Sequence, residues 1–136
     1  MMILSLNKKV SSFFLVLFLP IAFCFAGSQI IEQASEAQKN IIQAALGNQY
    51  PIKQIACVKS AHHKKAYYIA AVFYAEGVGN ITGIWLVGGE KNKPNLVYSV
   101  DGVAHQFSGM RKASETKAAA YISDPEVDLL RGHFRK

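Results

Sequence analysis

Cysteine, tryptophan and charge are all scarce in this chain. Its 136 residues include two cysteines and one tryptophan, and only 18% of them are charged. Two cysteines exclude a framework of several disulfides. The one long apolar run, residues 13–26, is shorter than the roughly 20 apolar residues that cross a membrane, and it contains Pro20, which breaks a helix. An uncleaved membrane anchor is therefore not expected.

Residues 1–26 instead have the order of regions typical of a cleavable signal peptide. Two lysines supply a positive start, the apolar run follows, and small side chains at Cys24 and Ala26 precede a cut after Ala26. A lipid anchor on Cys24 is disfavoured because bulky Phe23 comes directly before it. We expect a periplasmic or secreted protein, with no membrane span left after cleavage.

The mature chain, residues 27–136, is expected to fold as a single domain. It keeps 13 of the 15 Lys and Arg and all nine Asp and Glu, so its net charge is +4 with histidines neutral. These basic residues are scattered along the chain, so nucleic acid is not an expected partner. Only Cys57 remains, and its apolar neighbours favour a buried thiol over an intermolecular disulfide or a reactive site.

Residues 28–46 carry apolar side chains at helical spacing, which predicts an amphipathic helix. Ser28 is a suitable N-cap, and Gly47 followed by Pro51 supplies the end of the helix. Such a helix needs an apolar surface to pack against.

That surface is expected to be a sheet, because short β-rich runs separated by polar or glycine-rich turns follow the helix. The expected strands are residues 52–60, 66–75, 81–87 and 96–100. Connections this short favour antiparallel neighbours in a meander. Asp101 and the pair Asp124-Pro125 each predict the start of a short helix. The predicted fold is α+β: an N-terminal helix packed on a four-stranded antiparallel meander, with short C-terminal helices.

The second expected strand is apolar on both faces, so both faces need cover. If the C-terminal helices leave one face open, an aromatic patch remains exposed there. Such a patch would bind a protein partner, an envelope surface or a second copy of the chain. The residues predicted for this partner surface are Tyr68, Tyr74 and Trp85.

Several side chains are of types that form metal sites, phosphate-binding loops or catalytic sites in other proteins. His62-His63 lies beside two lysines that repel a cation, so a solvated turn is expected there and no metal site. Gly77-Val78-Gly79 lies between two expected strands, which predicts a hairpin turn and no phosphate-binding loop. A thiol enzyme would combine Cys57 with His105 and Asp101, but no local motif supports it. No catalytic residue and no cofactor is assigned.

Two stretches carry a resemblance. The sequence GIWLV from Gly83 to Val87 and the sequence SVDGVAHQFS from Ser99 to Ser108 resemble small exported bacterial proteins of unknown function. The resemblance implies a bacterial exported domain and transfers no catalytic residue.

The function expected from the sequence is that of an exported, non-enzymatic binding or accessory domain. One alternative is a cystatin-like protease inhibitor, because a helix laid across an antiparallel meander is the fold of those inhibitors. Residues 54–58 (QIACV) depart from their Gln-x-Val-x-Gly hairpin at the valine and at the glycine. The other alternative is the thiol enzyme that uses Cys57.

Overall fold

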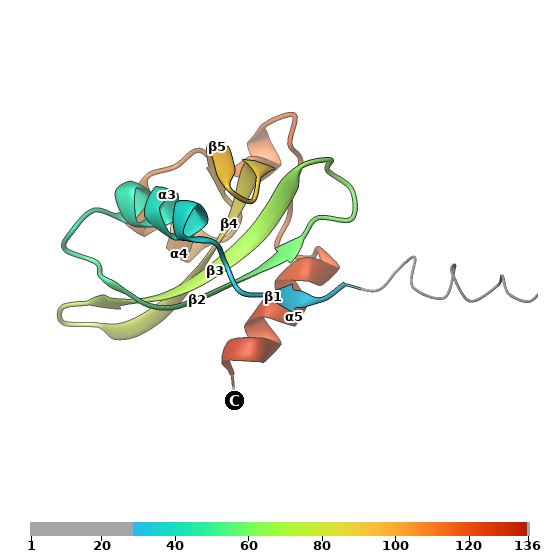
Figure 1. The fold of residues 1–136 in the computed structure, drawn as a ribbon. Helices are drawn as coiled ribbons and strands as arrows, with labels where there is room; N and C mark the ends of the chain where they lie inside the picture. Colours follow the sequence, from blue (N-terminus) through green and yellow to red (C-terminus); the bar gives the residue numbers. More distant parts are fainter. Residues whose placement is uncertain (1–28, 136) are drawn as a thin grey trace, which may run out of the picture.

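The computed structural model describes residues 29–135, so the expected signal peptide lies outside the described residues. Within this range the chain is α+β, with a five-stranded antiparallel sheet and three α-helices. Figure 1 shows α3 and α4 on one side of the sheet and α5 on the other. The predicted fold class is confirmed at this level.

The sheet is a meander in which each strand pairs with the next along the chain. Its strands are β1 (Ile31–Glu32), β2 (Ile52–Lys59), β3 (Ala66–Ala75), β4 (Gly79–Glu90) and β5 (Lys93–Ser99). All four expected strands occur, although β4 is longer at both ends than the prediction because it pairs along the whole of β3 and continues beside β5. The predicted count of four strands is corrected to five by β1.

The expected helix over residues 28–46 begins later than predicted. α3 spans Glu36–Leu46, and part of the preceding segment forms β1. Ser35 sets the start of α3: its Oγ accepts a hydrogen bond from the Gln38 backbone N–H at 3.0 Å. In return the Gln38 side-chain Oε1 accepts from the Ser35 N–H at 3.0 Å. This reciprocal capping box satisfies two backbone donors and makes Ser35 the N-cap in place of Ser28.

Side chains alternate across the sheet, so it buries apolar residues on both faces. We call these the α3/α4 face and the α5 face, after the helices that cover them. The α3/α4 face buries Ile42, Leu46, Cys57, Ile69, Ala71, Phe73, Trp85, Val87 and Ala104. The α5 face buries Ala56, Val58, Ala66, Tyr68, Ala70, Ile84, Leu86, Ala113, Ala120, Val127 and Leu130.

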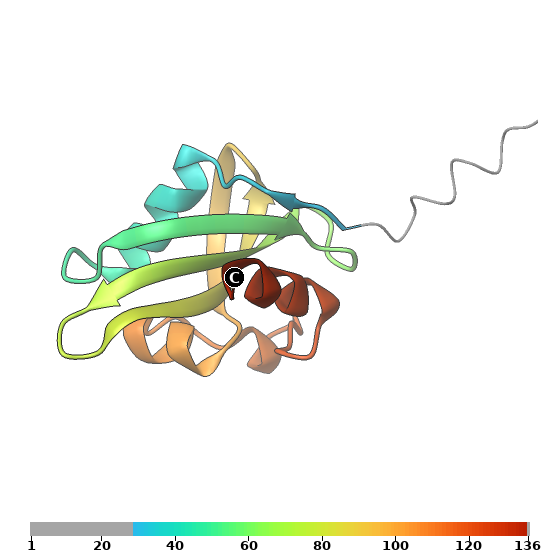
Figure 2. The ribbon, with the colours of Figure 1, turned by 90° about the horizontal axis from the view of Figure 1, so that it is seen from below.

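Both expected C-terminal helix starts are confirmed. α4 spans Gly102–Ser108, and its N-cap Asp101 accepts a hydrogen bond from the Ala104 N–H at 2.8 Å. α5 spans Pro125–Phe134, with Pro125 in its first turn, where the missing N–H costs no helical hydrogen bond. Figure 2, viewed from below, shows α5 lying over the face of the sheet opposite α3. None of the helices within residues 29–135 is long and apolar enough to cross a membrane.

Candidate functional site

The three aromatic residues predicted to bind a partner are not exposed together. Tyr68 and Trp85 are both 0% exposed, whereas Tyr74 is 41% exposed. The Trp85 Nε1–H donates to Ser108 Oγ at 3.0 Å beneath α4. The Tyr68 hydroxyl donates to Asp124 Oδ2 at 2.5 Å at the N-terminus of α5. α5 therefore covers Tyr68 and α4 covers Trp85. No patch made of all three residues reaches the surface.

Cys57 lies on β2 under the segment that joins β1 to α3. Its side chain is 0% exposed, and its Sγ faces the Gln33 carbonyl oxygen at 3.9 Å. Burial raises the pKa of the Cys57 thiol to about 11, although the nearby Lys91 ammonium opposes part of that rise. The thiol therefore stays protonated near neutral pH, which is the state of a packed side chain and not of a nucleophile.

The structure does not bring His105 and Asp101 to Cys57. Both residues belong to α4 and its cap, and α4 packs on β4 and β5. β2 lies two strands away from β4, a separation of roughly 10 Å across the sheet. His105 Nδ1 lies 2.9 Å from the Met110 carbonyl oxygen. Asp101 Oδ1 accepts from the Ala104 and Ile84 N–H groups, so both side chains hold local structure.

The adjacent histidines diverge, as expected for a turn. His62 is exposed, whereas His63 is held by Ser60 Oγ at 3.0 Å from its Nδ1 and by the Ala118 carbonyl oxygen near its Nε2. Across residues 29–135, no three His, Cys, Asp or Glu side chains gather as a metal site requires. His63 therefore ties the β2–β3 turn to the segment before α5.

The other two sequence candidates are parts of the sheet. Gly77 lies in the turn between β3 and β4, and Gly79 is the first residue of β4; their φ angles of +85° and +101° are ones that glycine adopts without strain. Residues 54–58, the segment compared with the inhibitors' hairpin, lie inside β2 and away from any hairpin tip.

An open strand edge is the feature that sequence reasoning missed. β1 pairs with only two residues of β2, Val58 and Cys57, so among the described residues no strand lies on the outer side of the rest of β2. The Ser60 N–H donates to the Ala66 carbonyl oxygen at 3.0 Å, which makes these residues a hydrogen-bonded pair of β2 and β3. Because antiparallel pairs alternate, every second residue of β2 directs its backbone groups toward β3. The residues between them direct theirs outward, and Ile55 is one of these.

Ile55 therefore presents a backbone N–H and a carbonyl oxygen at the outer edge of β2. Within residues 29–135 it has no strand partner on that side and no other hydrogen bond to these groups. The neighbouring outward positions are closed. Cys57 is opposite Glu32, and beyond the β-bulge between Ile52 and Gln54 the Ile52 N–H donates to the Gln43 side chain at 3.1 Å. The open edge is thus a short strip, which we define as residues 53–56.

A hollow of ≈ 630 Å³ runs along this strip between β1, β2 and the last turn of α5. Its lining consists of Ile31, Glu32, Gln33, Gln54, Ile55, Ala56, His133 and Phe134. Ala56 lies on the α5 face, and Ile31 and Phe134 pack against the core of that face. The small Ala56 side chain lines the hollow together with two larger apolar side chains, Ile31 and Phe134.

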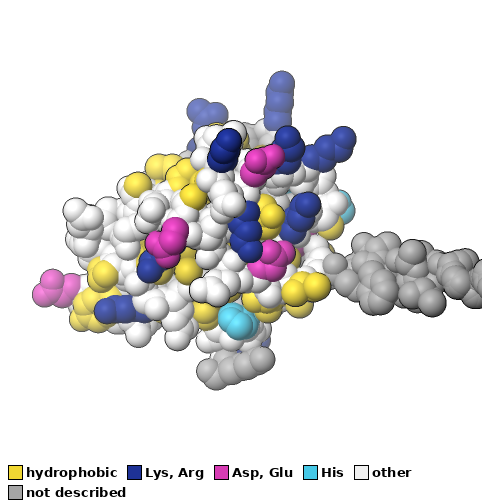
Figure 3. All heavy atoms as spheres, in the orientation of Figure 1, with side chains coloured by type: hydrophobic (Ala, Val, Ile, Leu, Met, Phe, Trp, Pro, Cys, Tyr) yellow, Lys and Arg dark blue, Asp and Glu magenta, His cyan; other side chains and the backbone are white. Residues whose placement is uncertain are grey.

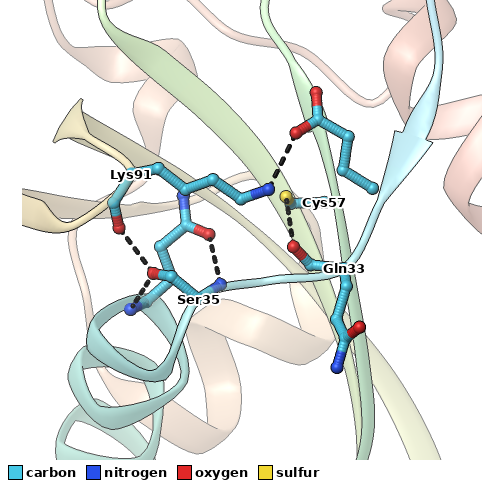
Figure 4. A network of polar contacts seen from close by, with 6 residues as sticks. Gln33, Ser35, Cys57 and Lys91 are labelled. Atoms are coloured by element: carbon cyan, nitrogen blue, oxygen red, sulfur yellow. Dashed lines mark hydrogen bonds and ion pairs between the residues drawn. The ribbon is translucent and has the colours of Figure 1, made fainter.

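A polar network holds β1 in place and directs the chain away from the strip. Lys91, in the turn between β4 and β5, places its Nζ 2.8 Å from Glu32 Oε1, and its carbonyl oxygen accepts from Ser35 Oγ at 2.5 Å. Figure 4 shows Lys91 reaching toward β1 from the side of α3, with Cys57 facing Gln33 beside it. The hydrogen bond to Glu32 raises the pKa of Lys91 and keeps it charged. Because Ser35 is tied to Lys91, the chain leaves the sheet right after Glu32.

The outer edge of β5 differs from that of β2. Pro94 within β5 has no N–H to donate, and the Ser99 N–H at the far end donates to the Arg111 carbonyl oxygen at 2.8 Å. Proline and covered ends are common means of blocking an edge strand. α3 also contacts β5. The β2 strip has no proline, and within residues 29–135 no segment covers it, so among the described residues it is the more accessible of the two edges.

Charge is spread over the surface. Figure 3 shows the molecule in the orientation of Figure 1. The Lys and Arg side chains in this view lie mainly over its upper part, separated by uncharged surface and by acidic side chains. On β2 itself the charged residues are Lys53 and Lys59, both exposed.

Comparison of the chain with protein-family models, with curated proteins and with solved structures found no match.

Proposed function

We propose that residues 27–136 form an exported, non-enzymatic binding domain that accepts an extended segment of a partner protein along the β2 strip. Export rests on the signal-peptide pattern of residues 1–26. The observation that carries the binding function is the outward-facing, unpaired backbone of Ile55 beside the ≈ 630 Å³ hollow. In this mode the segment adds a strand to the sheet: backbone hydrogen bonds hold it, and its side chains select the site.

The geometry defines how the segment lies. It runs antiparallel to β2 and in line with β1, and it begins where β1 ends opposite Cys57. Two hydrogen bonds join it to Ile55, and its alternate side chains point to the α5 face, where the hollow lies. A strip of four residues gives a small contact, which favours a transient partner over a permanent subunit.

The roles of the candidate catalytic residues support binding over catalysis. Cys57 is buried with its pKa raised to about 11. Asp101 caps α4, and His105 lies against a backbone carbonyl. Each of these side chains has a structural partner that accounts for its position.

The test is a selection of binders from a displayed library of random ten-residue peptides, followed by site-specific photo-crosslinking. A photo-reactive residue placed at Gln54, which is exposed on β2, is expected to crosslink to the selected peptides. The same residue at Asn95, exposed on β5, is the matched control and is expected not to crosslink. Equal crosslinking at both positions, or at neither, contradicts the proposal.

A backbone variant tests the same point by different means. Ile55→Pro removes the outward N–H, and we expect it to weaken peptide binding at least about tenfold, the equivalent of one lost hydrogen bond. Circular dichroism shows whether the variant folds. If a folded Ile55→Pro protein binds the peptides as well as the parent, the strip is not the binding site.

A further inference from the structure

We infer that the segment accepted by the β2 strip is acidic, with a large apolar residue followed about three residues later by Asp or Glu. This inference rests on the proposed function and specifies its ligand. It follows from the charges along the strip, the floor of the hollow and the direction in which the segment must run.

The free charge along the strip is positive. β2 has the sequence IKQIACVK, with two lysines and no acidic residue. Lys53 is exposed at the open end, and among residues 29–135 no carboxylate lies within ion-pair distance of it. The acidic side chain at the other end of the hollow, Glu32, is neutralised by Lys91 at 2.8 Å. A carboxylate on the ligand would therefore meet an unpaired ammonium group, and a basic ligand would meet repulsion.

The hollow takes a side chain at one position of the segment. Residues directly opposite each other in an antiparallel pair point to the same face. The ligand residue opposite Ala56 therefore points to the α5 face, above the small Ala56 side chain and between Ile31 and Phe134. Both neighbours are apolar, and they offer a large apolar side chain contact on two sides. His133 adds a polar side chain to the lining of the hollow.

The order of the two ligand residues follows from the register. An antiparallel segment that starts opposite Ala56 proceeds toward Lys53, because β2 runs the other way. Lys53 lies in a β-bulge, because the pairing of β2 with β3 passes directly from Ile52 to Gln54. The ligand residue nearest Lys53 therefore comes about three residues after the position opposite Ala56. In a segment that continues the antiparallel direction of β1, the apolar residue therefore comes first and the acidic residue second.

The test uses synthetic ten-residue peptides that contain this pattern and matched peptides in which Lys replaces the acidic residue. We expect the acidic peptide to bind at least about tenfold more tightly at low salt, with the difference shrinking as salt is raised. Lys53→Glu is expected to reverse the preference. Lys93→Glu on β5, which is also exposed, is the matched control and is expected to leave the preference unchanged.

The outcomes separate this inference from the proposed function. If acidic and basic peptides bind equally, and both crosslink at Gln54 but not at Asn95, the strip binds extended segments and the acidic ligand is wrong. If Lys93→Glu changes the preference as much as Lys53→Glu, the effect comes from net charge and the inference is also wrong. If neither peptide nor any library member crosslinks at Gln54, the proposed function itself fails.

Discussion

The helices on the two faces of the sheet are held in place by different kinds of contact. On the α3/α4 face, aromatic rings pack edge to face: the centroids of Tyr50 and Phe107 are 5.1 Å apart, and those of Phe73 and Phe107 are 5.4 Å apart. The α5 face is lined largely by alanine and aliphatic side chains. Its edge carries polar contacts, in which Tyr68 bonds to Asp124 and the Ala61 N–H donates to Glu126 Oε2 at 2.8 Å.

The difference bears on the candidate site. Aromatic packing depends on shape and buried area, and it holds α4 and α3 against the sheet as one core. α5 depends more on hydrogen bonds between residues far apart in the sequence, and its last turn forms one wall of the hollow. The position of that wall is therefore sensitive to single polar substitutions. Four changes test this comparison, from the largest expected effect to the smallest.

Trp85→Ala tests the aromatic face. Trp85 is 0% exposed, and its removal should lower the free energy of unfolding by about 3–5 kcal/mol, because it leaves a large cavity and removes the hydrogen bond to Ser108 Oγ. Urea denaturation measures the change. Tyr74→Ala, at a site 41% exposed, is the control and should cost less than about 1 kcal/mol. Equal losses for the two variants would mean that the aromatic core does not hold this face.

High pH tests the buried thiol on the same face. The pKa of Cys57 is about 11 in the folded protein, against an ordinary value of 9.0 that applies when the chain is unfolded. Above pH 9 the unfolded thiol therefore loses its proton while the folded one keeps it, and stability falls as pH rises. By pH 11 this loss should reach about 2–3 kcal/mol. Stability curves between pH 8 and 11 measure it.

Cys57→Ala is the control for that experiment. It should flatten the decline between pH 9 and 10, even if it lowers stability by a constant amount at every pH. An unchanged decline in this variant would place the titrating group elsewhere. Tyr68, whose pKa is raised by burial and by its hydrogen bond to Asp124, adds to the decline only above its ordinary value of 10.0.

Glu126→Ala tests the polar contacts of the α5 face. Glu126 is 0% exposed, and the substitution removes the side chain that accepts the hydrogen bond of the Ala61 N–H, at a cost of about 1–3 kcal/mol. Asp128→Ala, exposed on the same helix, should change stability by less than about 0.5 kcal/mol. The Ala61 amide should exchange faster in Glu126→Ala alone. If its exchange rate does not change, Glu126 does not hold the β2–β3 turn to α5.

Tyr68→Phe has the smallest expected effect. It removes only the hydroxyl that bonds to Asp124, and Asp124 Oδ2 keeps its hydrogen bond from the Tyr121 N–H at 3.0 Å. We expect a loss of about 1 kcal/mol, measured by thermal unfolding. A loss as large as that of Trp85→Ala would contradict the comparison, because it would make a single rim contact as important as the aromatic core.

Most of the fold follows from local patterns in the sequence. β2 and β3 match the expected strands almost residue for residue, because their runs of β-branched and aromatic residues end at clear turns. The start of α3 was missed because Ile30 and Ile31 fit the apolar side of a helix as well as they fit a strand. Ser35 followed three residues later by Gln38 is the capping-box pattern that marks the true start.

The candidate site was harder to predict. The strip is open because β1 stops at Glu32, and β1 stops there because Ser35 is bonded to Lys91, 56 residues further along the chain. No local pattern in the sequence indicates a contact at that separation. Likewise, Tyr68 and Trp85 have the composition of a binding surface, and only the placement of α5 and α4 determines that they are buried.

The most direct test of the β2 strip is amide hydrogen exchange measured by NMR, with and without a peptide selected from the library. Ile55 is the residue to follow, and Val97, which faces outward on β5, is the internal reference. We predict that peptide binding slows exchange at Ile55 at least about tenfold and leaves Val97 unchanged. Slowed exchange at Val97 with no change at Ile55 would contradict the account.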